Sequence, residues 1–221
     1  MAGQTNGLRW QYKFLALLTA GLIASGLLLL ILSEFHEEIT QPLLSTLDQR
    51  AMSGVHAWTA PGLTRVMLIC AFIGGWRFVT TMVALLVVVM LLRRAERDAG
   101  VLALSVAGSA VLNVGLKLFF PRTRPTVAWA LAHELSFSFP SGHAVAAFCF
   151  YATMACLLAR EQRGSTRTIL IVLAVGIIFG VGVSRVYLGV HYPSDIAAGY
   201  LVGALWVSSV ILALHYLEHR I

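Results

Sequence analysis

Long apolar runs separated by short polar stretches dominate the pattern of the chain. A helix that crosses a bilayer needs about 20 mostly apolar residues. Runs of about this length cover residues 14–33, 99–116, 144–159, 168–183 and 196–214. Two of these runs are slightly short, so we expect their ends to extend into the membrane interface. The pattern therefore predicts an all-α protein embedded in a membrane.

The stretch 67–92 fits this pattern less simply. It is apolar throughout except for Arg77, and Gly74-Gly75 interrupts it. If the stretch is divided at the glycines, neither half spans a membrane comfortably. We predict one crossing over residues 76–92, preceded by a short interfacial or re-entrant helix. The complete pattern then gives a polytopic membrane helical bundle with six transmembrane helices and both termini on one side.

The composition supports this prediction and excludes other classes. Charged residues make up 12% of the chain, whereas a soluble domain has about 25% charged residues. The net charge is +6, but no polar basic stripe interleaved with aromatic residues is present, so nucleic acid is not an expected partner. An anionic membrane surface and an anionic substrate fit the charge better. Residues 1–221 form one predicted domain without internal repeats, and no obligatory protein partner is evident.

Basic residues predict the orientation in the membrane. On the six-crossing map, one side holds nine Lys and Arg and the other holds seven. The first group is Arg9, Lys13, Arg93, Arg94, Arg97, Arg160, Arg163, Arg167 and Arg220. Lys117, Arg124 and Arg185 in the second group have a chemical role, argued below. Because basic residues concentrate on the cytoplasmic side, we predict cytoplasmic termini in a bacterial inner (plasma) membrane, with the amphipathic segment 37–58 along the outer interface.

Three polar clusters occur at the ends of predicted crossings, all on the outer side. The first follows the third crossing and contains Lys117, Arg124 and Pro125. Pro121 and Pro125 stiffen the segment that presents Arg124. An arginine can bind two phosphate oxygens at once, and a lysine adds a compact positive charge. The alternative is that these residues only anchor a helix end at the interface.

The second cluster is Phe139-Pro140-Ser141-Gly142-His143, which enters the fourth crossing. Ser141 is a suitable N-cap, and the amides after it have no partners within the helix. A helix N-terminus with free amides binds anions, and Gly142 allows a ligand to approach the backbone closely. The alternative is an ordinary capped helix start with an interfacial histidine.

The third cluster runs from Ser184-Arg185 through His191 to Asp195, between the last two crossings. Pro193 favours a helix start, and side chains four residues apart share one helical face. If the helix opens early enough, Asp195 accepts a hydrogen bond from one ring nitrogen of His191 and leaves the other nitrogen free to attack. The alternative is a surface salt bridge.

Acidic residues are scarce around these clusters. Glu134 and Asp195 are the only acids in residues 99–160 and 168–214, so Mg²⁺ or Ca²⁺ would lack oxygen ligands. His143, His191 and Asp195 nominally offer three zinc ligands, and zinc therefore remains an alternative. We predict a site without a metal or a cofactor. Glu134 is interpreted as an interfacial residue that tunes Arg124 or contacts a head group.

The motifs K-x6-R-P, P-S-G-H and S-R-x5-H-x3-D, in this order, resemble the type 2 phosphatidic acid phosphatase family, whose relatives include vanadium haloperoxidases. The resemblance covers about residues 99–214 and implies a two-step displacement without a cofactor. His191 would be the nucleophile that forms a phosphohistidine, and Asp195 would orient it. His143 would protonate the leaving group and then activate water. The residues that would bind phosphate are Lys117, Arg124, Ser141, Gly142 and Arg185.

The resemblance also indicates the substrate class. A site at the outer face favours a lipid with its phosphate at the membrane surface and its tail among membrane lipids. Undecaprenyl pyrophosphate and phosphatidylglycerophosphate are the leading candidates, followed by phosphatidic acid and lipid A phosphates; residues 133–195 particularly resemble phosphatidylglycerophosphate phosphatases of the B type. The alternatives are a catalytically silent lipid-phosphate binding or transport protein, a haloperoxidase-like use of bound vanadate, and a receptor or scaffold.

Overall fold

A computed structural model of the chain describes residues 41–132 and 134–218, together with Ala16, Thr19, Ile23 and Leu27. Within the two long ranges every regular element is a helix and none is a strand. The elements are α2 (Gln41–His56), α3 (Pro61–Gly74), α4 (Trp76–Leu92), α5 (Glu96–Phe119), α6 (Gly142–Ala147), the π-helical turn η2 (Phe148–Ala152), α7 (Thr153–Ala159), α8 (Gly164–Tyr187) and α9 (Pro193–Glu218). The predicted all-α class is confirmed for this part of the chain.

Four helical stretches in the described ranges are long and apolar enough to cross a membrane. They are Glu96–Phe119, Gly142–Ala159, Gly164–Tyr187 and Pro193–Ala213. A fifth span results if α3 and α4, which meet at an angle of 51°, are counted together. The first predicted crossing, residues 14–33, lies outside the described residues except for four positions. The count of six crossings therefore stays a prediction.

The predicted crossings are shorter than the observed helices because apolar runs do not include polar helix ends. The first turn of α5 contains Glu96 and Asp98, whose negative charges are favourable at a helix N-terminus. Likewise, α9 begins at Pro193, a residue that suits the first helical position. The predicted division of residues 67–92 is confirmed, since α3 ends at Gly74 and α4 begins at Trp76.

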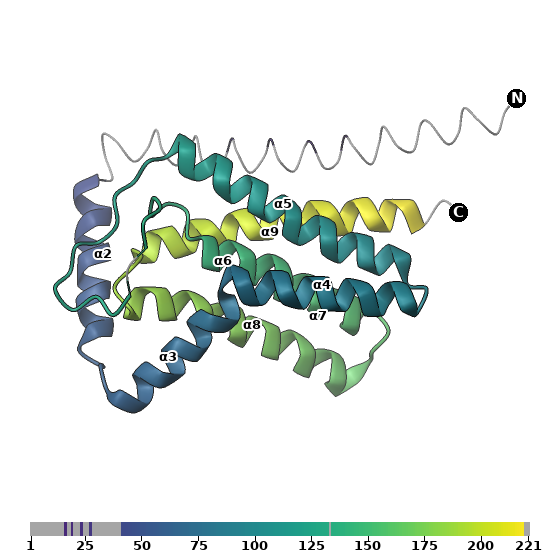
Figure 1. The fold of residues 1–221 in the computed structure, drawn as a ribbon, viewed down its shortest axis with the longest axis horizontal. Coiled ribbons are helices and arrows are strands. Elements are labelled where there is room, and N and C mark those ends of the chain that lie inside the picture. Colours follow the sequence, from purple (N-terminus) through teal and green to yellow (C-terminus); the bar gives the residue numbers. More distant parts are fainter. Residues whose placement is uncertain are drawn as a thin grey trace, which may run out of the picture.

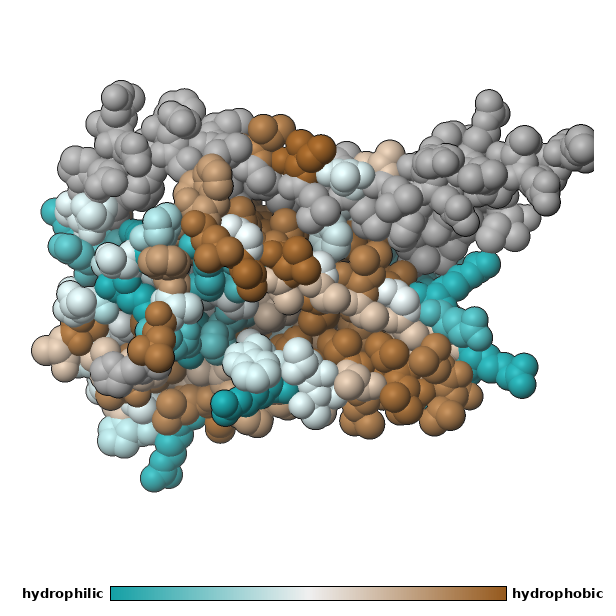
Figure 2. All heavy atoms as spheres, turned by 45° about the horizontal axis from the view of Figure 1, so that its top comes forward, coloured by the Kyte–Doolittle hydropathy of each residue, from teal (hydrophilic) through white to brown (hydrophobic). Residues whose placement is uncertain are grey.

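The long helices run side by side, and α2 crosses one end of the bundle (Figure 1). We call this the site end. The opposite end contains the turns between α4 and α5 and between α7 and α8. Apolar side chains cover the middle of the molecule, and hydrophilic side chains gather toward its two ends (Figure 2). This distribution is the one expected of a bundle whose middle faces lipid.

Small residues bring α9 close to α6 and η2. A Cβ atom on Gly199 would lie 2.8 Å from the Ala144 Cβ, and one on Gly203 would lie 2.8 Å from the Phe148 Cβ. Glycines four residues apart let membrane helices approach closely. The approach aligns the starts of α6 and α9, and the Ser141 N–H donates a hydrogen bond to the Asp195 carbonyl at 3.1 Å. The second and third polar clusters are thereby joined through the backbone.

Candidate active site

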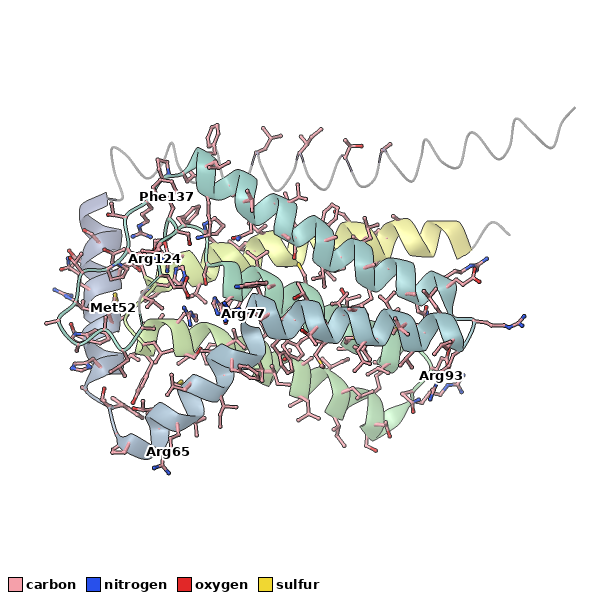
Figure 3. The ribbon with its side chains drawn as sticks, viewed as in Figure 1. Met52, Arg65, Arg77, Arg93, Arg124 and Phe137 are labelled. Carbon is pink, nitrogen blue, oxygen red and sulfur yellow. The ribbon has the colours of Figure 1, made fainter. Side chains whose placement is uncertain are left out.

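The polar clusters meet at the site end of the bundle. Arg124 and Phe137 lie there beside α2, whereas Arg93 lies at the opposite end (Figure 3). The end of α5, the start of α6 and the link between α8 and α9 all reach this end. The structure thus brings together residues that are up to 78 positions apart, since Lys117 begins the first cluster and Asp195 ends the third.

His191 and Asp195 form a buried pair. The His191 Nδ1 lies 3.3 Å from the Asp195 Oδ2, and the two side chains are 1% and 0% exposed. The predicted hydrogen bond exists because α9 begins at Pro193, early enough to place Asp195 in its first turn. With Nδ1–H donating to the carboxylate, the lone pair of the ring is on Nε2.

Arg124 hydrogen-bonds to that second nitrogen, so the prediction that it is left free is wrong for the structure without substrate. Its Nη1 donates to the His191 Nε2 at 3.0 Å and to the Val190 carbonyl at 2.8 Å, and its Nε donates to the Ser136 carbonyl at 2.7 Å. Burial lowers the pKa of the His191 imidazole, and this outweighs the opposite effect of the Asp195 carboxylate. His191 is therefore neutral at neutral pH and accepts the hydrogen bond from Arg124.

Glu134 lies between three groups that resemblance assigns to the reaction. Its Oε2 accepts from the Arg124 Nη2 at 2.9 Å, and its Oε1 accepts from the Arg185 guanidinium. The same Oε1 lies 3.9 Å from the His143 Nδ1. Burial raises the pKa of the Glu134 carboxyl, but the charges of Arg185 and Arg124 outweigh this, and the pKa lies below its ordinary value. The carboxylate thus places a negative charge between these two guanidinium groups.

A pocket of about 210 Å³ opens beside these groups. Its polar lining includes Lys117, Arg124, Glu134, Gly142 and His143. Its other wall comes from α4 and α5 and mixes the apolar residues Trp76, Val79, Val106 and Ala110 with the polar residues Thr80, Ser109 and Asn113. The pocket therefore combines a cationic end with a partly apolar wall formed by two helices.

Two other predicted residues, Ser141 and Arg185, do not line this pocket. Ser141 is fully buried, and its hydroxyl accepts a hydrogen bond from the Ala144 N–H at 3.5 Å, as the predicted N-cap requires. Arg185 is 4% exposed. The Lys117 ammonium, at the end of α5, donates to the Phe137 carbonyl. This hydrogen bond connects the first cluster to the loop that leads into the second.

The sequence pattern of the PAP2 superfamily matches residues 98–218, more than half of the chain. The chain belongs to the PAP2 superfamily. It is 36% identical over 148 residues to phosphatidylglycerophosphatase B of Bacillus subtilis (strain 168), an alignment that covers 66% of this chain and 72% of that protein. The predicted family is confirmed.

Two further PAP2 comparisons agree with this. The chain is 33% identical over 148 residues to YbjG of Escherichia coli (strain K12), named as a candidate undecaprenyl-diphosphatase, covering 64% of this chain and 71% of that protein. Its fold resembles the crystal structure of a transmembrane PAP2 type phosphatidylglycerolphosphate phosphatase from Bacillus subtilis. The TM-score is 0.73 with 28% sequence identity, and the match covers 95% of this chain and 98% of that one.

The sequence did not predict three residues of the site. One of them, Asp48, precedes residues 98–218, which the PAP2 pattern covers. The Arg122 Nη1 donates to the Asp195 Oδ1 at 2.6 Å, and the Ser138 hydroxyl donates to the Asp195 Oδ2. Asp48, on α2, pairs with the Arg122 Nη2 at 2.9 Å. Arg122 lies in the same proline-bounded segment as Arg124, which is a local signal. Asp48 has none, because its partners are more than 70 residues away.

The side chains of the described residues do not form the zinc site that remained an alternative. In residues 41–132 and 134–218, no group of three or more His, Cys, Asp or Glu side chains is arranged to hold a metal ion. The nitrogen and oxygen atoms of His191 and Asp195 that face each other are engaged in their mutual hydrogen bond. The three cysteines, Cys70, Cys149 and Cys156, form no disulfide.

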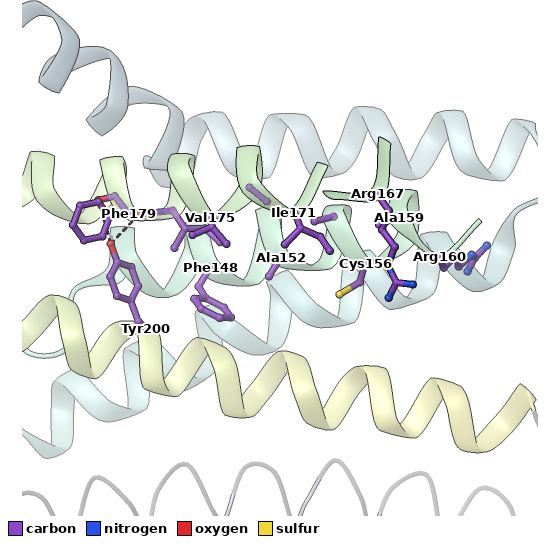
Figure 4. Close-up of a pocket in the computed structure, with 13 residues that line it drawn as sticks. Phe148, Ala152, Cys156, Ala159, Arg160, Arg167, Ile171, Val175, Phe179 and Tyr200 are labelled. Atoms are coloured by element: carbon purple, nitrogen blue, oxygen red, sulfur yellow. Dashed lines mark hydrogen bonds between the residues drawn. The ribbon is translucent and has the colours of Figure 1, made fainter. Parts of the chain in front are cut away.

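A second, larger cavity of the PAP2 fold is a groove of about 530 Å³ between α7, α8 and α9 (Figure 4). Its lining runs from Arg160 and Arg167 at one extreme to Phe179 and Tyr200 at the other. The Tyr200 hydroxyl donates to the Ile178 carbonyl at 2.8 Å, so the one polar side-chain atom at that extreme is satisfied. None of the three polar clusters lines this groove.

Proposed function

We propose that this PAP2 protein is an integral membrane lipid phosphatase that transfers a terminal phosphate to His191 and then to water. The observation that carries the proposal is the state of the His191 ring. Its Nδ1 is engaged by Asp195, and its Nε2 lone pair faces the Arg124 guanidinium. A neutral imidazole, oriented by a carboxylate and adjacent to an anion-binding group, is arranged as a nucleophile for phosphorus.

In the first step the Arg124 Nη1–H is released from the His191 Nε2 to a phosphate oxygen, and the freed lone pair forms a bond to phosphorus as the bond to the leaving oxygen breaks. His143 gives that oxygen its proton, and Asp195 balances the positive charge that develops on His191. In the second step His143 takes a proton from water, which attacks the phosphohistidine. Inorganic phosphate leaves, and the neutral imidazole is restored. Neither step needs a cofactor.

The phosphate oxygens would take the place of the Glu134 carboxylate. That carboxylate already pairs with Arg124 and Arg185, which resemblance assigns to phosphate binding. In addition, the buried Arg185 Nε has no hydrogen-bond partner within the described part of the chain. A buried donor without a partner is costly, and a phosphate oxygen would accept from it. Lys117, the Ser141 hydroxyl and the backbone N–H of Gly142 complete the proposed phosphate site.

The apolar wall of the site pocket supports a substrate with a lipid tail. Trp76 and Val79 on α4 and Val106 and Ala110 on α5 line the same pocket. A phosphate bound at Arg124 would therefore have its alkyl chain directed between two membrane helices. The two named relatives are a phosphatidylglycerophosphatase and a candidate undecaprenyl-diphosphatase. We infer that phosphatidylglycerophosphate and undecaprenyl pyrophosphate are the first lipids to test, before phosphatidic acid and lipid A phosphates.

The proposed topology has six crossings, cytoplasmic termini and the site on the outer face. The turns that contain Arg93, Arg94, Arg160 and Arg163 lie together at the end opposite the site. An excess of arginine at one end of a bundle is typical of the cytoplasmic side. A reporter fused after Ile221 should remain cytoplasmic. Exposure of that reporter outside the cell would contradict the six-crossing map.

The direct test of the activity uses the purified full-length chain in detergent with EDTA. We expect phosphate release from at least one of the four lipids, and no release by His191→Ala. His56 is a matched control, because it stacks on Trp129 at the same end of the bundle without contacting the site cluster. His56→Ala should retain activity. Activity that disappears with EDTA and returns with zinc would contradict the proposal, and binding without release would favour the silent lipid-binding alternative.

A further inference from the structure

Helix α2 contributes a buried carboxylate to the site end. Asp48 is 3% exposed, although α2 is the most peripheral of the helices there. Its Oδ1 accepts from the Ser194 N–H at 3.0 Å, and its Oδ2 accepts from the Ser194 hydroxyl at 2.6 Å. The same Oδ2 accepts from the Arg122 Nη2 at 2.9 Å. Both carboxylate oxygens are thus hydrogen-bonded, and all their partners lie beside Asp195.

Arg122 connects this carboxylate to the nucleophile pair. Its Nη2 binds Asp48, and its Nη1 binds the Asp195 Oδ1 at 2.6 Å. The guanidinium also lies over the Tyr192 ring, with 4.1 Å between its Cζ and the ring centroid. One planar group therefore joins two carboxylates from different helices. The second of these is already hydrogen-bonded to His191 through its other oxygen.

The charges along this chain of contacts have a chemical consequence. Attack on phosphorus converts the neutral His191 into a cationic phosphohistidine, which Asp195 must stabilise. Arg122 alone would cancel the charge of Asp195 at close range. With Asp48 present, the two carboxylates and the one guanidinium sum to one negative charge. The net charge of Asp48, Asp195, Arg122 and His191 together then becomes zero as His191 becomes cationic. This neutralisation favours formation of the intermediate.

We propose that Asp48 is a positioning residue of the phosphatase reaction, acting through Arg122 to orient Asp195 and to preserve its negative charge for His191. The inference rests on the proposed function, because it assigns a partner to the proposed nucleophile. Asp48 lies outside residues 98–218, which the PAP2 pattern covers. The site would thus depend on a helix that this pattern does not include.

A purely structural role for Asp48 would be to fasten α2 to the bundle. Met52 provides a separate way to loosen that attachment, because it is 3% exposed and packs with Val186 and Ile196. Its packing partners in that cluster are apolar and aromatic side chains. Loss of α2 docking and loss of the Asp48 charge are therefore separable by substitution.

The experiment compares Asp48→Asn, Asp48→Glu and Met52→Ala in the full-length protein in detergent. The readouts are kcat, KM, the inhibition constant for inorganic phosphate, and thermal unfolding. Asp48→Asn should lower kcat by about tenfold to a hundredfold, the range typical of residues that orient a reacting group through another. KM and phosphate inhibition should change little, because Lys117, Arg124 and Arg185 are untouched. Asp48→Glu keeps the charge and should recover most of kcat.

Met52→Ala should lower the unfolding temperature while kcat stays near that of the wild type. A folded Asp48→Asn protein with unchanged kcat would overturn the inference. So would an equal loss of kcat in Met52→Ala, which would assign the effect to α2 docking. If Asp48→Asn does not fold, Arg122→Lys supplies the same comparison, because it keeps the charge but cannot bind both carboxylates with one planar group. Failure of the function itself is distinguishable, since the wild type would then release no phosphate, or His191→Ala would remain active.

Discussion

The two ends of the bundle carry charge in different ways. At the site end, the side chains of Arg185 and Asp195 are 5% and 0% exposed. At the opposite end, Arg160 forms two hydrogen bonds with Asp98, but its side chain is 41% exposed. Other arginines at that end, including Arg93 and Arg163, are also exposed. Similar residues thus occupy very different environments in one molecule.

This difference distinguishes two kinds of charge. The exposed charges of the opposite end indicate how the bundle is oriented in the membrane, and the buried charges of the site end act in the proposed reaction. An exposed ion pair contributes about 0–1 kcal/mol and keeps most of its hydration. A buried charge loses several kcal/mol of hydration and persists only with close partners. The buried arginines of the site end are therefore retained despite their desolvation, as expected of residues that bind a substrate. Substitutions at the two ends should have correspondingly different effects.

The largest contrast is expected between two arginine deletions. Arg185→Ala removes a buried partner of Glu134 and a proposed ligand of phosphate, and kcat/KM should fall by about 10²–10³-fold. Arg163→Ala removes an exposed arginine at the opposite end, and kcat/KM should stay within about twofold. Phosphate release from one lipid by both variants measures the difference. Equal losses would remove the distinction between the two ends.

A smaller effect is expected when the internal anion of the site is neutralised. Glu134→Gln leaves Arg124 and Arg185 without their carboxylate, so inorganic phosphate no longer competes with it. The inhibition constant for phosphate should fall by about tenfold, which is about 1.4 kcal/mol. Inhibition of lipid hydrolysis by added phosphate provides the measurement. A weaker inhibition in Glu134→Gln would show that the carboxylate assists phosphate binding.

The burial of His191 should also be visible in the pH dependence. Only the neutral ring attacks, and burial lowers its pKa below its ordinary value of about 6.5. The nucleophile therefore stays neutral as pH falls past 6.5 and is lost only when pH falls through the lowered pKa. The acid limb of kcat/KM should lie below pH 6.5 in a profile measured with a single lipid. An acid limb above that value would be inconsistent with a buried, neutral His191.

The smallest effect is expected at the opposite end. Asp98→Asn weakens the pair with Arg160, which links α5 to the residue after α7. The free energy of unfolding should fall by no more than about 1 kcal/mol, and kcat should not change. Thermal unfolding and phosphate release would be measured on the same preparation. A loss of kcat as large as that of Arg185→Ala would mean that the two ends are coupled.

The sequence was informative where the signal is local. The long apolar helices follow from apolar runs, and the pair His191 and Asp195 follows from a spacing of four residues across the start of α9, since His191 lies two residues before Pro193. The local sequence likewise indicates the early start of α9, because proline favours the first helical position. Such features depend on neighbouring residues, so a single sequence is enough to predict them.

Contacts between distant segments were not predictable in this way. Asp48 reaches Arg122 and Ser194 only because α2 crosses the end of the bundle. The role of Glu134 as a partner of Arg185 also depends on how a loop folds back over α8. The π-helical turn η2 leaves the apolar pattern unchanged and gives no signal of its own. Three-dimensional packing decides all of these.

The most direct measurement traps the covalent intermediate. Full-length protein is mixed with an undecaprenyl pyrophosphate whose terminal phosphate is radiolabelled, quenched in alkali during turnover, and digested for peptide mapping. The account predicts an acid-labile, alkali-stable label on His191 that forms during turnover and is absent from His191→Ala. A label on another residue, or turnover of this or another lipid phosphate with no labelled protein at any time, would contradict it.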